Sequence, residues 1–208
     1  MADETTPPTR YTPAIPLPPY SYVPGHGLPH PVNDPSGHLY ATRDSAHEPQ
    51  FSSDNPGSSP ADTNLRRRGL AAALRMNSRW LHAIDLFNEG FYWEAHESWE
   101  TFWHALGRTT AEARFVQALI HLTAACVKIR EGKPTGVRSH TQRARKLLAE
   151  VEAENDGGGS SGGSCTLGLS PESIAAVFAE LHDYQPACWH TSRFPVVKVL
   201  VAGLRVAM

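Results

Sequence analysis

Proline divides this 208-residue chain into two kinds of sequence. Thirteen of the 17 prolines fall within the first sixty residues, where tyrosines are interleaved with them. Proline fixes φ and lacks an amide proton, so this arm is predicted to form neither a helix nor a central strand. We expect disorder at residues 1–12 and 41–62. Residues 15–38 carry apolar anchors such as Tyr20 and are predicted to lie across the folded part.

From about residue 65 onward, apolar residues recur every three or four positions, which predicts helices. Glycine and proline signals bound five such segments, at about residues 65–88, 92–106, 110–132, 135–153 and 170–185. A β-branched run at residues 194–201 could form a short strand or an extended lid, but no partner strand is visible. The sequence therefore predicts an all-α fold, a compact helical bundle of about five helices with a Pro-rich N-terminal arm.

The same signals suggest four parts in the chain. These are a Pro-rich arm at 1–64, a helical core at 65–154, a Gly/Ser linker at 155–169, and a C-terminal helix with an extended tail at 170–208. The linker lacks the Gly-Lys-Ser/Thr ending that cradles phosphate in nucleotide-binding loops. A nucleotide site is therefore not expected there.

Composition narrows the classes of partner. A net charge of −2 creates no long-range field for nucleic acid or anionic lipid, and no apolar stretch reaches membrane-spanning length. We expect neither partner, and we interpret the basic residues Arg66, Arg67, Arg68, Arg138, Arg143, Arg145 and Lys146 as a solvated helix surface. Three cysteines without paired spacing and no recognisable signal peptide predict reduced thiols and a cytoplasmic location.

The segment from Phe91 to Trp103 contains the most informative pattern. At about 100° per residue, His96 and Glu100 fall inside its aromatic stripe, whereas Glu94 falls on the opposite side and should face water. Burying an imidazole and a carboxylate costs free energy unless each has a partner. We expect either a structural His–Glu pair or a metal or catalytic site, and the pattern alone does not decide between them.

Known metal motifs do not match this segment. Glu100 holds the position of the second histidine of the zinc-protease HExxH motif, and Glu97 falls at the edge of the stripe. The paired Glu-x-x-His segments of di-iron bundles are also absent from the sequence. Imidazole and carboxylate suit zinc, iron or manganese, but a third ligand must then come from another helix.

The third predicted helix offers such a ligand. Between two apolar faces runs a narrow polar line made of Arg114, Gln117, His121 and Lys128. A short turn near Gly107 would set the two helices antiparallel, so this line should face His96 and Glu100. We expect the metal ligands to be His96, Glu100 and His121, in a polar pocket with Trp103, Arg114 and Gln117.

An ordered set of motifs runs through this region: Phe87-Asn88, Gly90, His96-x-x-x-Glu100-x-x-Trp103, Arg114, Gln117, Leu119-Ile120 and Gly132-x-x-x-Gly136. Over roughly residues 80–150 the set resembles DUF309, a bacterial and archaeal family of domains of unknown function. The resemblance implies a compact helical domain of a prokaryotic protein. It also implies a His-x-x-x-Glu-x-x-Trp signature, suggested to bind metal, at His96, Glu100 and Trp103.

Three functions remain open from the sequence, and whether the chain is an enzyme is not decided. The first is a metal-dependent hydrolase that holds zinc, manganese or iron, with His121 as ligand or general base and Arg114 as anchor for an anionic substrate. The second is a binding or scaffold module, in which the polar network is structural. The arm, or an aromatic patch around Trp93 and Trp99, would then meet a protein partner or a second copy of the chain. Nucleic-acid binding is the third, and the net charge of −2 argues against it.

Overall fold

The computed structural model describes residues 10–41, 60–156, 166–184 and 194–207. These residues form six helices and no strand: α1 Pro60–Arg75, α2 Ser78–Asn88, α3 Tyr92–Ala105, α4 Ala111–Arg130, α5 Pro134–Asp156 and α6 Pro171–Asp183. The predicted all-α fold is confirmed. The predicted disorder at residues 1–12 and 41–62 falls mostly outside the described residues, but residues 10–12 are ordered and α1 already begins at Pro60.

The first predicted helix is in fact two helices. Asn77 separates α1 from α2, and its side chain accepts hydrogen bonds from the backbone N–H groups of Arg79 and Trp80. Such an N-cap satisfies amide donors at a helix start that have no partner inside the helix. The single-helix prediction was wrong here because the apolar spacing continues across Asn77 and hides the break.

The other boundaries follow the expected signals. Gly90 takes a φ of +88° in the turn between α2 and α3, a conformation that favours glycine. Thr110 caps α4 through the backbone N–H of Ala113, and Ser170 caps α6 through the N–H of Ser173. Local capping chemistry therefore sets where most of these helices begin and end.

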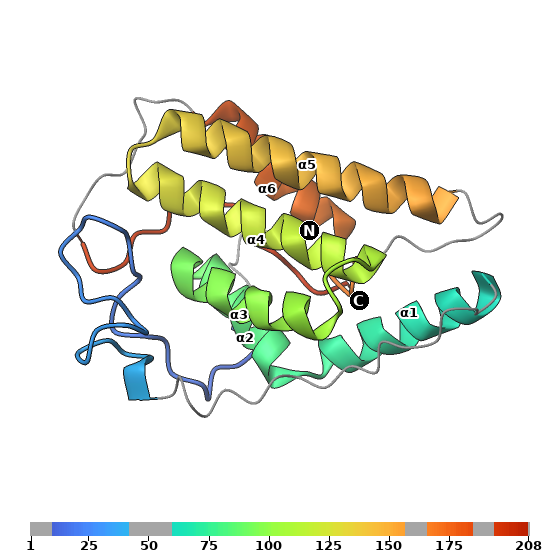
Figure 1. Cartoon of the computed structure of the whole chain (residues 1–208), viewed down its shortest axis with the longest axis horizontal. Helices are drawn as coiled ribbons and strands as arrows, with labels where there is room; N and C mark the ends of the chain where they lie inside the picture. Colours follow the sequence, from blue (N-terminus) through green and yellow to red (C-terminus); the bar gives the residue numbers. More distant parts are fainter. Residues whose placement is uncertain (1–9, 42–59, 157–165, 185–193, 208) are drawn as a thin grey trace, which may run out of the picture.

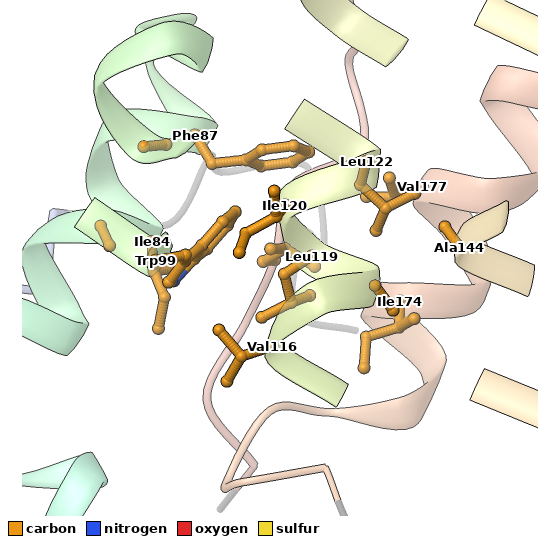
Figure 2. Close-up of a cluster of buried hydrophobic side chains, with 14 of the residues drawn as sticks. Ile84, Phe87, Trp99, Val116, Leu119, Ile120, Leu122, Ala144, Ile174 and Val177 are labelled. Atoms are coloured by element: carbon orange, nitrogen blue, oxygen red, sulfur yellow. The ribbon is translucent and has the colours of Figure 1, made fainter. Parts of the chain in front are cut away.

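Helix α4 is the centre of the bundle. In Figure 1 it lies between α3 and α5, while α2 lies next to α3. Figure 2 shows buried side chains meeting α4 from both directions, with Ile84, Phe87 and Trp99 from α2 and α3, and Ala144, Ile174 and Val177 from α5 and α6. The two apolar faces of α4 therefore fill the interior, and one narrow strip of the helix remains for polar residues.

The N-terminal arm lies along α2 and α3, as its tyrosine anchors predict. The buried carboxylate of Asp85 accepts hydrogen bonds from the N–H groups of Tyr11 and Thr12, each at 2.8 Å. Glu94 of α3 accepts one from the N–H of Tyr22 at 2.9 Å. Glu94 was expected to face water and is instead buried, because the arm covers the outer face of α3.

The C-terminal tail, residues 194–207, is an extended segment rather than a strand. The hydroxyl oxygen of Tyr92 accepts hydrogen bonds from the N–H of Val199 at 3.0 Å and of Leu200 at 3.3 Å. The side chain of Asn88 pairs with both the N–H and the C=O of Leu204. The turn between α2 and α3 is thus held by residues more than a hundred positions later. Within the described ranges, none of the helices has the length and apolar character needed to cross a bilayer.

Candidate metal centre

Three side chains of α3 form a compact group, His96, Glu97 and Glu100, called the α3 triad below. One potential ligand atom from each lies within 4.8 Å of the other two. Nε2 of His96 lies 3.4 Å from Oε1 of Glu100, as the spacing of four residues predicts. The His96 side chain is 25% exposed and that of Glu100 39%, so solvent and small solutes can reach the triad.

His96 and Glu100 lie beside the core-facing stripe of α3, whereas the sequence predicted that they lie inside it. The buried residues of α3 that face the core are Tyr92, Ala95, Trp99 and Phe102. The side of the helix that carries His96 and Glu100 is half-exposed. The core face is shifted because α3 packs against α2 as well as α4, which centres the stripe on Trp99.

A threonine from α4 orients the imidazole of His96. Its hydroxyl oxygen, Thr123 Oγ1, lies 3.3 Å from Nδ1 of His96 and 2.7 Å from the carbonyl oxygen of Ile120. A hydroxyl has one proton, and the shorter contact to Ile120 uses it, so Oγ1 accepts the Nδ1–H of His96. The other ring nitrogen, Nε2, therefore faces Glu100, and it can bind a metal ion once the proton that it donates to Glu100 is released.

The two carboxyl groups of the triad are shifted in opposite directions. Burial, helped by the negative charge of Glu100, raises the pKa of Glu97 above its ordinary value. The hydrogen bond from His96 lowers the pKa of Glu100, although burial acts against it. When the pKa values of two neighbouring carboxyl groups are shifted in opposite directions, the two groups are suited to different roles. Glu100 is suited to remain an anionic ligand, and Glu97 is suited to exchange a proton.

His121 lies on α4, outside the triad, and pairs with His140 of α5. Their Nδ1 atoms are 3.1 Å apart. Burial, followed by the charges of His140, Arg143 and His96, lowers the pKa of His121 to about 4. Burial also lowers the pKa of His140. His121 is therefore uncharged near neutral pH, and the neutral imidazole is the form that binds metals.

The structure does not bring Arg114 to the triad. Its guanidinium donates to the carbonyl oxygen of Thr109 at 2.6 Å and forms an ion pair with Glu154, in the last turns of α5. Gln117 is half-buried one helical turn before His121, on the same side of α4. The predicted pocket that joins Arg114 to His96 and Glu100 is therefore not found.

Trp103 is half-buried one turn after Glu100. Its ring centroid lies 5.1 Å from that of His104 and 5.2 Å from the guanidinium carbon of Arg108. A cation over an indole face is electrostatically attracted. The observed partners of Trp103 thus hold the end of α3 and the turn that follows it.

The predicted aromatic patch around Trp93 and Trp99 is not an open surface. Trp99 is fully buried, with its ring packed against Trp80 and Phe87. Trp93 is half-buried and its ring lies edge-on to those of Tyr22 and His30 from the arm. The chain's own arm therefore occupies the surface that was offered to a partner.

Sequence reasoning missed three residues around the centre, namely Glu97, Thr123 and His140. A signal existed for Glu97, since a residue three positions before Glu100 lies on the same side of a helix. His140 stands among basic residues in the sequence, and nothing there marks it as part of a site. Only the packing of α5 against α4 places it beside His121.

Comparison with known families places the centre in context. Residues 80–140 match the family model described as "Domain of unknown function (DUF309)". The matched span covers most of α2, all of α3 and α4, and the start of α5, and so includes the α3 triad, Thr123 and the His121–His140 pair. No curated protein and no solved structure matches the chain.

Proposed function

We propose that the part of the chain that matches the DUF309 family model, residues 80–140, binds a divalent metal ion through His96, Glu100 and His121. The proposal extends to hydrolysis as the reaction class. The observation that carries it is the α3 triad, in which an imidazole and two carboxylates lie within 4.8 Å of one another beside solvent.

His96 and Glu100 supply the first two ligands from one helix. Their spacing of four residues directs both side chains to the same side of α3, and their polar atoms already lie 3.4 Å apart. The acceptor at Thr123 holds His96 with Nε2 facing Glu100. The lowered pKa of Glu100 keeps its carboxylate charged, as a ligand must be.

His121 supplies the third ligand in this proposal. A general base works best when its pKa lies near the working pH, and a pKa of about 4 makes His121 a poor proton acceptor at neutral pH. The same shift keeps its imidazole neutral without competition from protons. His121 is therefore better suited to bind a metal than to remove a proton.

Glu97 then serves as the proton acceptor. It adjoins the first histidine ligand, and its raised pKa lies closer to neutrality than that of an ordinary glutamate. A divalent ion held by three protein ligands keeps an open position and lowers the pKa of a bound water. Glu97, whose carboxyl group lies within 4.8 Å of the ligand atoms of His96 and Glu100, would accept a proton beside that ion.

The types of ligand in the proposed site limit which metal ions fit it. Two imidazoles and one carboxylate are borderline to hard ligands, which suit zinc, iron(II) and manganese(II). The half-exposed triad agrees with a site that exchanges solutes, since closed structural zinc sites use four protein ligands. We also propose a cytoplasmic location, in line with the free and buried thiol of Cys126.

One observation favours a second candidate, a binding or scaffold module. His96 and Glu100 already form an ion pair with each other, so they need no metal to be satisfied. In that case these polar side chains only hold α3 against α4, and they neither bind a metal nor catalyse a reaction. The two candidates differ in one measurable property, the affinity of the folded chain for a divalent ion.

Calorimetric titration of the untagged protein with zinc, manganese and anaerobic iron(II) tests the proposal. We expect one ion per chain, and a loss of at least tenfold in affinity for His96→Ala and for Glu100→Ala. His182→Ala removes an exposed histidine of α6 and is the matched control. No binding by the wild-type chain, or equal binding by all four proteins, excludes the metal site and leaves the scaffold.

A further inference from the structure

We propose that His140 is a positioning residue for this site, which accepts the Nδ1–H of His121 and leaves Nε2 of His121 free to bind the metal. The inference deepens the proposed function and rests on it. It concerns a residue outside the ligand set, on the helix that follows α4. Its basis is the contact between the two rings and the proton count of a neutral imidazole.

The contact is an interhelical one with hydrogen-bond geometry. The two Nδ1 atoms lie 3.1 Å apart, and the ring planes are inclined at 41° with centroids 5.3 Å apart. The rings come from α4 and α5, which pack along each other and are joined by the short turn at residues 131–133. Because both helices are fixed in the bundle, the separation of the two nitrogens is a property of the fold.

The proton count allows two arrangements. A neutral imidazole has one N–H and one lone pair, so one Nδ1 donates and the other accepts. If His140 donates, the Nδ1 lone pair of His121 is used and its Nε2 carries the proton. No lone pair of His121 then remains for a metal. If His121 donates, its Nε2 is unprotonated and available.

Only the second arrangement is compatible with His121 as a ligand. It gives His121 the partner that metal-bound histidines usually have, an acceptor for the ring N–H that does not face the metal. His96 has such a partner in Thr123. Both histidines would then present Nε2 to the ion, each with its Nδ1–H held by a residue of a neighbouring helix.

The tautomer can be measured without any metal. Long-range ¹H–¹⁵N correlation spectra of the metal-free protein separate Nδ1–H from Nε2–H imidazoles, and loss of one set of signals in His121→Ala assigns the ring. We expect the Nδ1–H tautomer at His121 and the Nε2–H tautomer at His140. The reverse pair of tautomers overturns the inference, whatever the metal titrations show.

Metal affinity provides the second readout. His140→Ala should weaken binding of zinc or manganese by about 10–100-fold, the usual effect of losing such an orienting partner. His140→Glu restores an acceptor and should recover most of the affinity, which a purely structural role does not predict. His182→Ala again serves as control, and circular dichroism checks that each variant is folded.

The outcomes separate this inference from the proposed function. Absence of binding by the wild-type protein overturns the metal site itself, and the positioning role falls with it. Tight binding by the wild type that His140→Ala leaves unchanged overturns only the role of His140. Weak binding by both His140→Ala and His140→Glu, with both proteins folded, also counts against the acceptor role.

Discussion

Nδ1 of His96 lies 3.3 Å from the hydroxyl oxygen of Thr123, so a residue of α4 sets the orientation of an imidazole on α3. The contact joins the two helices at the point where the α3 triad begins. Thr123 is fully buried, and its hydroxyl also donates to the carbonyl oxygen of Ile120. This hydroxyl is therefore fixed in space before any ion arrives.

Removal of this hydroxyl should weaken metal binding while the fold is retained. Thr123→Val keeps the branched shape but cannot accept the Nδ1–H of His96, so we expect a loss of about 10–100-fold in metal affinity. Thr123→Ser keeps the acceptor and should stay close to the wild type. Calorimetric titration of the three proteins makes the comparison, and equal affinities for the valine and serine variants would contradict it.

The two carboxylates of the triad should respond differently to conversion into amides. Glu100→Gln removes a charged ligand and is expected to weaken metal binding by at least tenfold. Glu97→Gln should change affinity only a few fold, because Glu97 is assigned to proton transfer. The opposite order of effects would exchange the two assignments. The shifted pKa values of the two groups, raised for Glu97 and lowered for Glu100, are the reason for this order.

Stability should depend on pH through Glu94. Burial raises its pKa in the folded state to about 7, against 4.5 for an ordinary glutamate. Between these values the folded chain holds a proton that the unfolded chain has released. The contribution of Glu94 to stability therefore falls as pH rises from 4.5 to 7, and stays low above pH 7.

Glu94→Gln tests this dependence. The amide cannot ionise, yet its oxygen can still accept from the N–H of Tyr22. We expect the variant to gain about 1–3 kcal/mol over the wild type at pH 8, with the difference shrinking towards pH 4.5. Urea unfolding at pH 4.5, 6 and 8 measures it, and Glu152→Gln, on the exposed surface of α5, is the control. A constant difference across the three pH values would refute the assignment.

The arm should detach locally when Asp85 is lost. Asp85→Ala removes the acceptor for two backbone N–H groups and for the hydroxyl of Thr12, which donates at 2.6 Å. We expect a loss of about 2–4 kcal/mol in the free energy of unfolding, because these contacts are buried and charged. Hydrogen exchange should accelerate at Tyr11 and Thr12. Asp34→Ala, which breaks only a local contact to Ser36, is the matched control.

Much of the helical framework can be predicted from local chemistry. Ser170 and Pro171 mark the start of α6 and Gly90 marks the turn before α3, because each supplies what a helix end requires. The helix boundary at Asn77 was not predicted, because apolar residues recur at helical spacing on both sides of it. Cys126 lies among the apolar residues of α4 and is fully buried.

The site was harder to predict because it depends on how separate helices meet. A helical wheel treats α3 alone, so it could not show that the arm buries Glu94 or that α2 shifts the core face away from His96. Arg114 continues the polar line of α4, but its guanidinium forms an ion pair with Glu154 of α5. Such choices among partners are decided by three-dimensional packing and leave no local trace in the sequence.

The contacts of the C-terminal tail with α2 and α3 determine which fragment of the chain is suitable for experiments. Asn88 and Tyr92 belong to the span that matches the family model, yet the groups that satisfy them come from residues 199–204. A fragment trimmed to residues 80–140 would keep every proposed ligand and lose these backbone partners, as well as the arm above Asp85 and Glu94. The span that matches the family model is thus shorter than the set of residues in contact with it, and metal titrations belong on the intact chain.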